Sequence, residues 1–419
     1  MNKIVAKGGN ELKGEVNISS AKNSVLPIIA ASILSSGKCV IENAPMFEDV
    51  FVISSVLESI ESNVFIDKDT NKIIIDSSNV LNLQPDMDLV KKMRASFLIM
   101  GPMISKFGSF KISFPGGCNI GTRPIDLHLK GFNALGADIS IGHGYVEAKA
   151  TSLKGNKIYL DFPSVGATEN IMMAAVLAKG ETIIENAAEE PEIEDLANFL
   201  NKMGANVIGA GTDTIKIIGV KELKGTIHKP IYDRIEAGTF MIAAAITRSK
   251  IKINGINEEH LKPIIAKLNE MNVDIDVIGE SILVNAKKEL KPIDIKTMPY
   301  PGFPTDMQAQ MMGLLCTVEG TSFITETIFE NRFMHVPEMK KMGANIKIDG
   351  RNAVIEGVDK LTGCQVRATD LRAGAALILC GLAAEGTTEI TDIYHIDRGY
   401  VNIENKLKRL GAFIKRIDK

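Results

Sequence analysis

The eight residues ALGADISI (134–141) indicate the fold, because similar eight-residue segments recur along the chain. Three of them keep its glycine: KMGANVIG (202–209), KMGANIKI (341–348) and RLGAFIKR (409–416). Two weaker copies complete the series, EMNVDIDV (270–277) and SIESNVFI (59–66). Aligned on the glycine position, with Ser62 and Asn272 in its place in the weaker copies, they follow one another in steps of 68 to 74 residues. A period this regular predicts six copies of one structural unit.

Each copy predicts a helix end followed by an alternating strand. Gly, or Asn272 or Ser62 in its place, would adopt the left-handed conformation that ends many helices. Upstream, most copies contain a helix that is apolar on nearly every face and leads through glycine into a β-branched strand. The clearest examples are NIMMAAVLAKGETIIENA (170–187), AQMMGLLCTVEGTSFITET (309–327) and AALILCGLAAEGTTEITDI (375–393). Because a helix without a polar face is buried, we predict an α/β fold of six βαβ-type units with helices inside and sheets outside.

The length of the repeat favours compact lobes over a solenoid. Solenoid units usually have about 20 to 45 residues, whereas these have 68 to 74. Three copies fall in roughly 22–229 and three in roughly 230–419, and no Pro-rich or Gly/Ser-rich linker marks the boundary. We expect a ligand site in a cleft between two such lobes.

Composition excludes several classes of protein. A chain of 419 residues with 45% hydrophobic content can bury two or more cores, and a net charge of −3 gives no argument for nucleic-acid or acidic-membrane binding. Neither a signal peptide nor an apolar run of membrane-spanning length is present. The five cysteines are scattered and form no CxxC pair, which predicts a reduced cytoplasmic location and no metal. An anionic substrate would therefore need a local cluster of basic residues.

Functional residues are best sought where the copies depart from their shared pattern. One departure is PGGCNIGTRPIDLHLKGFNALG (115–136), in which Cys118 lies among Gly116, Gly117 and Gly121. The segment continues with Arg123 and into a predicted helix whose first turn would hold Pro124 and Asp126. Glycines, a cation and a helix N-terminus suit anion binding by a mobile loop. The alternative is that Cys118 is a small apolar filler, as we expect for Cys39, Cys316, Cys364 and Cys380.

Other departures place polar residues at the ends of buried helices. Lys22 and Asn23 begin an apolar helix, so the lysine is expected to point at an anion, and Arg94 precedes another apolar stretch. Asp306 lies in PYPGFPTDMQAQMMG (299–313), where it could instead complement a helix dipole, since Thr305 and Gln308 have the spacing of a capping box.

Basic residues recur at equivalent, loop-side places in different repeats. A lone arginine is usually a surface ion pair of small effect, but a set of them could converge on one cleft and hold phosphate and carboxylate groups. Near three members of the set, His335, Asp370 and Asp397 are predicted at helix starts or strand ends. The basic set consists of Lys22, Arg94, Arg123, Arg332, Arg372 and Arg398.

Together these segments resemble the UDP-N-acetylglucosamine 1-carboxyvinyltransferase family, over nearly the whole chain. The most specific matches are PGGCNIGTRPIDLH, FPTDMQAQ and ENRFMHVPE. The resemblance implies a two-lobed inside-out α/β barrel, with residues 1–21 and 230–419 in one lobe and 22–229 in the other. It implies transfer of enolpyruvate from phosphoenolpyruvate to the 3′-hydroxyl of UDP-N-acetylglucosamine, with release of phosphate through a tetrahedral intermediate. This is the first committed step of peptidoglycan synthesis, it needs neither metal nor cofactor, and the antibiotic fosfomycin targets it.

The resemblance also implies roles for individual residues. Cys118, Asp306 and Lys22 would be the catalytic residues. Cys118 would be the general acid toward the vinyl carbon and the residue that fosfomycin alkylates, and Asp306 the general base at the sugar hydroxyl. The phosphoenolpyruvate site would consist of Lys22, Arg94, Arg123, Arg372 and Arg398. The UDP-sugar site would consist of Asn23, Arg94, Arg123, Pro124, Asp126, His128, Ser164, Val165, Gly166, Asp306 and Ile328.

One departure from the family pattern concerns the nucleotide. Some members carry a lysine two residues before the serine of SVGAT, where this chain has Phe162. We expect the aromatic ring to replace a charge contact by stacking on the uracil.

Four other interpretations remain open at this stage. The sister enzyme 3-phosphoshikimate 1-carboxyvinyltransferase has the same fold but lacks a PGGC-type loop. RNA 3′-phosphate cyclase would require nucleic-acid contacts that this charge pattern hardly supports. A catalytically silent UDP-sugar sensor would have no need of Lys22, Cys118, Asp306 and Arg398 together. A purely structural repeat protein leaves the clustered departures unexplained.

Overall fold

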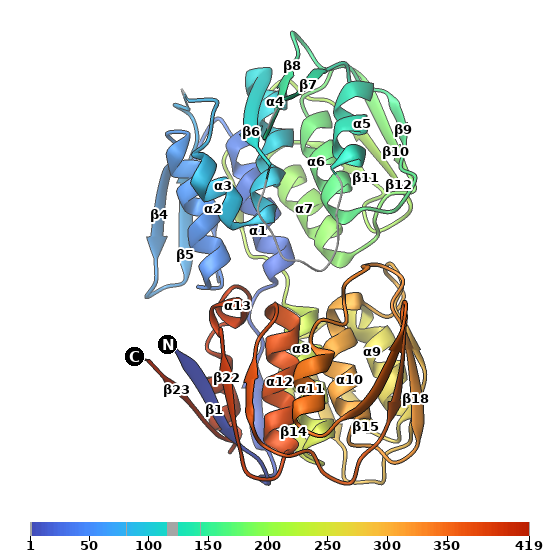
Figure 1. Cartoon of the computed structure of the whole chain (residues 1–419). Coiled ribbons are helices and arrows are strands. Elements are labelled where there is room, and N and C mark those ends of the chain that lie inside the picture. Colours follow the sequence, from blue (N-terminus) through green and yellow to red (C-terminus); the bar gives the residue numbers. More distant parts are fainter. Residues whose placement is uncertain (1, 81, 115–124, 143, 419) are drawn as a thin grey trace. The chain divides into compact units, whose positions relative to one another are not determined.

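The computed structural model describes residues 2–80, 82–114, 125–142 and 144–418, which form two compact units. The central unit comprises 20–114 and 125–231, and the terminal unit comprises 2–19 and 232–418. Each holds three sheets and its own core (Figure 1). The described strands form six separate sheets and no closed barrel.

The central unit packs its three sheets around buried helices. Its sheets have the orders β13(Ile227–His228)–β3(Cys39–Ile41)–β5(Lys72–Asp76)–β4(Asn63–Asp67), β6(Ser109–Ser113)–β8(Tyr145–Lys149)–β7(Asp138–Gly142), and β11(Asn206–Ile208)–β12(Thr214–Ile218)–β10(Glu181–Glu185)–β9(Lys157–Tyr159). The inner helices are α1 (Lys22–Ala31), α4 (Met100–Phe107) and α6 (Val165–Ala175), and the outer ones are α2 (Glu48–Ser59), α5 (Asp126–Ala134) and α7 (Pro191–Lys202). Shorter pieces are η1 (Ser32–Leu34), α3 (Met87–Lys92) and η2 (Arg94–Ile99).

The terminal unit repeats this plan. Its sheets have the orders β21(Gln365–Arg367)–β22(Thr387–Thr391)–β1(Lys3–Lys7)–β23(Phe413–Ile417), β15(Asp274–Ile278)–β16(Ser281–Asn285)–β14(Lys250–Asn254)–β2(Lys13–Asn17), and β17(Ile295–Lys296)–β18(Thr321–Thr325)–β20(Asn352–Glu356)–β19(Asn345–Asp349). The inner helices are α8 (Arg234–Ile246), α10 (Gln308–Leu315) and α12 (Leu371–Ala383). The outer ones are α9 (Glu258–Glu270), α11 (Val336–Lys341) and α14 (Ile403–Arg409), with η3 (Thr305–Met307) and α13 (Tyr394–Asp397) between elements.

The inner helices are buried as their composition predicts. All thirteen residues of α8 and all eight of α10 are buried, and α6 is buried from Ala167 to its end. Three of the inner helices connect parallel strands, in the order β9–α6–β10, β17–α10–β18 and β21–α12–β22. The prediction of βαβ units with helices inside and sheets outside is therefore confirmed.

Six equivalent backbone hydrogen bonds end the six outer helices. In each, the amide three residues after the last helical residue donates to a carbonyl five residues earlier, as in a Schellman motif. The bonds join Ser62 to Leu57, Ala137 to Phe132, Ala205 to Leu200, Val273 to Leu268, Ala344 to Met339 and Ala412 to Leu407, at 3.0 to 3.2 Å. These bonds fix the true alignment of the repeats.

The prediction that Ser62 ends the first of these helices was wrong by one residue. Glu61, with φ of 70°, has the left-handed conformation that Gly136 and Asn272 have in their copies. Ser62 instead donates the returning hydrogen bond, like Ala137. Glutamate has no sequence signature for this conformation, which is why the weak copy was misaligned.

The chain start completes two sheets of the terminal unit. β1 pairs antiparallel with both β22 and β23, and β2 pairs in parallel with β14. The two ends of the chain therefore lie in one sheet, dark blue beside dark red in Figure 1. No helix within the described ranges is long and apolar enough to cross a membrane.

Candidate active site

The predicted site residues that the structure describes are divided between the two units. Cys118, Arg123 and Pro124 lie outside the described residues. The terminal unit carries Asp306, Ile328, Arg332, His335, Asp370, Arg372 and Arg398, and the central unit carries Lys22, Asn23, Arg94, Asp126, His128, Ser164, Val165 and Gly166.

Asp306 is the centre of the group in the terminal unit. It lies in η3, and its side chain is 27% exposed. Oδ1 accepts a hydrogen bond from Arg332 Nη2 at 3.0 Å, while Oδ2 accepts from Nε and Nη2 of Arg372 at 3.1 and 2.9 Å. Both arginine side chains are 4% exposed. Two buried cations thus hold a carboxylate that retains access to solvent.

The capping box expected from Thr305 and Gln308 does not form, although Asp306 does lie in the first turn of η3. The Thr305 hydroxyl donates to Glu326 Oε2 at 3.0 Å, and no side chain caps η3 or α10. Glu326 is buried and also accepts from the backbone amides of Ile328 and Phe329, at 2.8 and 3.2 Å. Glu326 therefore ties the Asp306 turn to the segment that carries Ile328.

Several buried polar atoms around this group have no protein partner within the described part of the chain. They are Arg372 Nη1, both ring nitrogens of His335, and both amide atoms of Gln308. Burial, together with the smaller effect of Arg332, lowers the pKa of His335 to about 4 against the opposing effect of Asp370. A neutral imidazole beside open donors suits a site that receives an anion.

Arg398 belongs to the same unit, but the prediction that Asp397 and Arg398 lie at a strand end or helix start was wrong. Asp397 ends α13 and Arg398 follows it, because the helix runs only from Tyr394 to Asp397. Asp397 makes an ion pair with Arg416, at 2.6 and 2.9 Å, so its carboxylate has a structural role. Arg398 lies close enough to His395 to lower the pKa of that imidazole, after the larger effect of burial.

In the central unit, Lys22 and Asn23 begin α1 as expected. Lys22 Nζ forms an ion pair with the buried carboxylate of Asp49, at 2.6 Å, whereas Asn23 is exposed. Ser24, the next residue, hydrogen-bonds to Asp195 of α7, which also accepts from the Ile231 amide at 3.0 Å. The contact between Ser24 and Asp195 thus holds the first turn of α1 against α7, while Asn23 is exposed to solvent.

The predicted nucleotide residues meet at the N-terminus of α6. Ser164 is its N-cap, with Oγ accepting from the Ala167 amide at 3.4 Å, and Val165 and Gly166 form the first turn. His128 lies against that turn, because a Cβ built on Gly166 would come within 3.2 Å of its Cε1. The N-terminus of a helix can bind an anionic diphosphate.

Two further residues border this helix end. Phe162 is 44% exposed, two residues before the cap, and Asp126 is the exposed first residue of α5. Arg94, at the start of η2, is near enough for its charge to lower the pKa of His128.

Sequence reasoning missed the residues that hold these groups in place: Asp49, Asn170, Asp195, Glu326 and Tyr400. Each is buried, and none has a motif of its own. The only signal available was a polar residue within a buried element, as Asn170 is within α6.

The described cysteines match the prediction of filler. Cys39, Cys316, Cys364 and Cys380 are free thiols, and burial raises the pKa of each. For Cys380 the pKa reaches about 12, so this thiol is inert at neutral pH.

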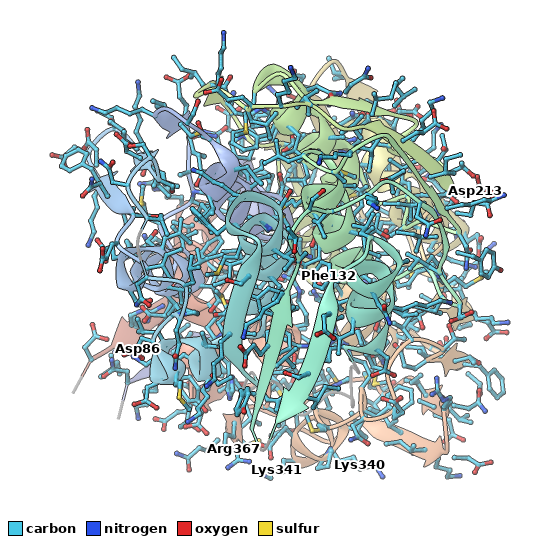
Figure 2. The ribbon with its side chains drawn as sticks, turned by 90° about the horizontal axis from the view of Figure 1, so that it is seen from above. Asp86, Phe132, Asp213, Lys340, Lys341 and Arg367 are labelled. Carbon is cyan, nitrogen blue, oxygen red and sulfur yellow. The ribbon has the colours of Figure 1, made fainter. Side chains whose placement is uncertain are left out.

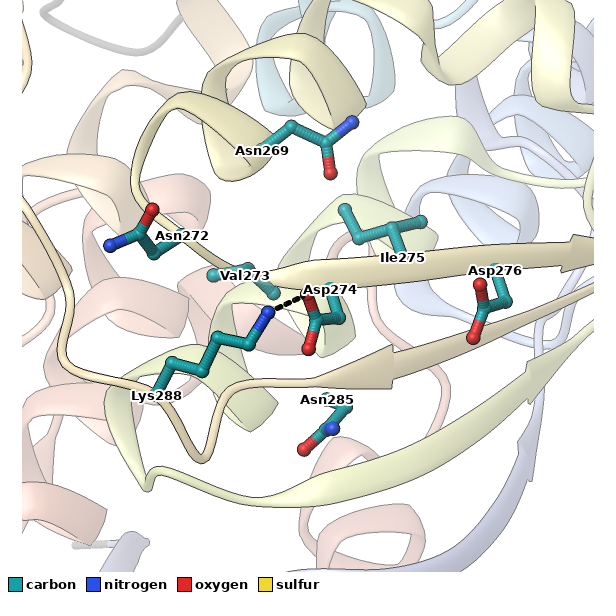
Figure 3. A pocket seen from close by; sticks show the side chains of 8 residues that line it. All are labelled: Asn269, Asn272, Val273, Asp274, Ile275, Asp276, Asn285 and Lys288. Carbon is teal, nitrogen blue, oxygen red and sulfur yellow. Dashed lines mark hydrogen bonds and ion pairs between the residues drawn. The ribbon is translucent and has the colours of Figure 1, made fainter.

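A pocket between α9, β15 and β16 carries none of this chemistry (Figure 3). Its polar lining includes Asp274, but Lys288 neutralises that carboxylate at 2.6 Å. It shares no residue with either group above.

Comparison with known proteins identifies the fold class of this chain. A family model described as EPSP synthase (3-phosphoshikimate 1-carboxyvinyltransferase) matches residues 6–407. The crystal structure of the enolpyruvyl transferase NikO from Streptomyces tendae matches with a TM-score of 0.90 and 25% identity, over 99% of this chain and 98% of that one. EPSP synthase from Acinetobacter baumannii, 18% identical over the whole of both chains with a TM-score of 0.77, shares the fold. The protein thus has the enolpyruvyl transferase fold, as predicted.

Relatives of higher identity narrow the class. UDP-N-acetylglucosamine 1-carboxyvinyltransferase 2 of Clostridium tetani is 77% identical over the full length of both chains. The proteins named UDP-N-acetylglucosamine 1-carboxyvinyltransferase 1 of Clostridium acetobutylicum and Staphylococcus epidermidis are 69% and 56% identical, again over both full lengths. The chain belongs to the UDP-N-acetylglucosamine 1-carboxyvinyltransferase family.

Proposed function

We propose that the protein transfers the enolpyruvyl group of phosphoenolpyruvate to the 3′-hydroxyl of UDP-N-acetylglucosamine, releasing phosphate in the first committed step of peptidoglycan synthesis. Full-length identity of 77% to a relative of that name is the observation that carries this proposal. The scattered, unpaired cysteines support a cytoplasmic place of work, where thiols stay reduced.

Asp306 is the proposed general base at the sugar hydroxyl. Its partial exposure gives access to a substrate, and its pairing with Arg332 and Arg372 keeps the carboxylate ionised at rest. The same pairing makes it a weak base, because a proton would displace two charge-assisted hydrogen bonds. Transfer therefore requires that at least one arginine turns to an anionic group of the substrate. The unpartnered Nη1 of Arg372 is suited to that contact.

Cys118 is the proposed general acid that protonates the vinyl carbon of phosphoenolpyruvate. The 3′-hydroxyl oxygen bonds to the adjacent carbon and gives up its proton, which forms the tetrahedral intermediate. That intermediate then loses phosphate and a proton from the methyl group, which restores the double bond. Lys22, Arg94, Arg123, Arg372 and Arg398 are proposed to hold the phosphate and carboxylate.

The nucleotide is proposed to bind at the N-terminus of α6. Ser164, Val165 and Gly166 present the backbone of the first helical turn, which supports a diphosphate site. Asp126, His128 and Pro124 are the proposed contacts from the adjoining segment. Asn23 and Ile328 are proposed to orient the sugar.

The test is phosphate release from phosphoenolpyruvate by the purified protein, with and without UDP-N-acetylglucosamine. We expect release only with the UDP-sugar, and none from a Cys118→Ala variant. A Cys364→Ala variant is the matched control, since that half-buried thiol lies elsewhere in the chain. Release with shikimate 3-phosphate in place of the UDP-sugar would assign the protein to the sister activity. Binding of the UDP-sugar without any release would identify a silent sensor.

A further inference from the structure

The inner helix α6 carries one polar side chain whose hydrogen bonds the proposed chemistry does not explain. Asn170 is completely buried, and its side chain contacts three other segments. Oδ1 accepts from the Gly101 amide of α4 at 2.8 Å. Nδ2 donates to the Phe97 carbonyl of η2 at 3.1 Å and lies 2.9 Å from Nδ1 of His128 in α5.

The orientation of this amide is fixed by the backbone. A backbone N–H can only donate and a backbone carbonyl can only accept, so Oδ1 must face Gly101 and Nδ2 must face Phe97. An amide flip would break both bonds at once and leave two buried backbone groups unsatisfied. The group that meets His128 is therefore the amide NH₂, a donor.

The protonation state of His128 follows. Nδ1 must accept the hydrogen bond from Asn170, so it carries no proton, and the proton of the neutral ring lies on Nε2. Desolvation, and then the positive charge of Arg94, lower the pKa of His128 to about 4, which agrees with a neutral ring. The Nε2 edge lies against Gly166, where a Cβ would come within 3.5 Å of that nitrogen.

Close packing keeps these groups in place. A Cβ on Gly131 of α5 would lie 2.2 Å from Ile171 of α6, and one on Gly101 would lie 2.3 Å from the Asn170 carbonyl oxygen. Phe132, labelled in Figure 2, is fully buried one turn after His128, with its ring edge-on to Phe110 at 6.0 Å. The close packing of α4, α5 and α6 thus holds the ring of His128 in place.

We propose that Asn170 is a positioning residue that fixes His128 as a neutral imidazole with its proton on Nε2. The ring then offers a hydrogen-bond donor to an oxygen acceptor of the uridine-diphosphate group at the first turn of α6. The alternative tautomer would offer a lone pair there and repel that oxygen. This inference rests on the proposed function, because it assigns a role to one wall of the nucleotide site.

The first test is the tautomer of His128 in the ligand-free wild type. Nitrogen-15 NMR of protein labelled at its six histidines distinguishes a protonated Nε2 from a protonated Nδ1. The His128→Gln spectrum assigns the signal by its loss. We expect the Nε2–H form at neutral pH, and an Nδ1–H form would overturn the proposal.

The second test is Asn170→Asp, which replaces the donor by an acceptor at the same place. We expect the proton to move to Nδ1 and the Kd for UDP-N-acetylglucosamine, measured by calorimetry, to rise at least about tenfold. Asn201→Asp is the matched control, because Asn201 makes the same pair of amide–backbone bonds with Val207 in the same unit and, within the described residues, no side-chain hydrogen bond to a histidine. The control should keep its affinity within about twofold.

An unchanged affinity in folded Asn170→Asp would also overturn the proposal. If that variant fails to fold, the tautomer of His128 measured in the wild-type protein still tests the proposal. Failure of the proposed function would appear separately, as absent phosphate release from a protein whose His128 shows the expected tautomer.

Discussion

Arg372 binds Asp306 through a single carboxylate oxygen, Oδ2, which accepts from Nε at 3.1 Å and from Nη2 at 2.9 Å. The arrangement differs from the usual bidentate pair, in which each oxygen takes one hydrogen bond. It leaves Oδ1 to Arg332 and one buried donor of Arg372 unused in the described structure. This unused donor is the observation that supports the proposed contact between Arg372 and an anionic group of the substrate.

The role of Asp306 can be tested by Asp306→Asn, which keeps the shape and removes the charge. We expect kcat for phosphate release to fall by about 10²- to 10⁴-fold, the range of general acid–base catalysis, with little change in UDP-sugar affinity. Asp276→Asn, on strand β15 of the same unit, should leave kcat unchanged. A variant with near wild-type kcat would remove Asp306 from the reaction.

Asp195 should stabilise the central unit. It accepts hydrogen bonds from Ser24 and the Ile231 amide, and it lies 2.9 Å from Nε2 of His228. Asp195→Asn replaces an acceptor by a donor in this buried network, so we expect the free energy of unfolding to fall by about 2 kcal/mol. Denaturant unfolding measures it, with exposed Asp213→Asn as the control, labelled in Figure 2. Equal stability of the two variants would contradict the assigned network.

Glu169 should make stability depend on pH. Burial, and then the charges of Glu192 and Glu190, raise its pKa well above the ordinary 4.5. Above pH 4.5 the unfolded chain ionises this carboxyl while the folded protein keeps it protonated, so stability is lost as pH rises toward the folded pKa.

The variant Glu169→Gln removes this dependence. We expect it to unfold at a higher denaturant concentration than wild type at pH 8, and the difference to shrink toward pH 4.5. Glu58→Gln, in an exposed position of α2, controls for the loss of a charge. A difference that grows toward acid pH would show that the sign is wrong.

Phe162 should contribute to nucleotide affinity. Its ring is 44% exposed two residues before the N-cap of α6. Stacking of an aromatic ring contributes about 0.5 to 1.5 kcal/mol, so Phe162→Ala should raise KM for the UDP-sugar about two- to tenfold. KM for phosphoenolpyruvate should stay the same, and Phe65→Ala, an exposed ring on β4, should change neither. Equal effects on both substrates would refute stacking on the uracil.

Much of the fold could be predicted because its signals are local. The left-handed residue that ends a helix, the alternation of a strand and the apolar faces of α8 and α10 all depend on neighbours a few residues away. The weak first copy failed for the same reason, since Glu61 adopts its conformation without any local preference for it. Part of the candidate site could also be predicted, because its residues lie where the six repeats depart from their shared sequence pattern.

The partners of those residues could not be predicted. Ser24 and Asp195 are separated by 171 positions, and Gly101 and Asn170 by 69. Asp306 and Arg372 are 66 positions apart. Nothing in the chain near Asp306 distinguished a carboxylate held by two arginines from one that merely begins a helix.

Six repeats, buried helices, outer sheets and a set of exceptional polar residues could all be predicted from the amino-acid sequence. The contacts between those polar groups became known from the folded chain: Arg332 and Arg372 hold Asp306, and Asn170 faces His128 with its donor. The periodic pattern of apolar residues reflects which residues of a helix or strand are buried. This pattern can be recognised within a few neighbouring residues of the sequence. A hydrogen bond or ion pair forms only where two groups come within about 3 Å of each other. Which groups do so depends on how elements that are distant in the sequence pack together.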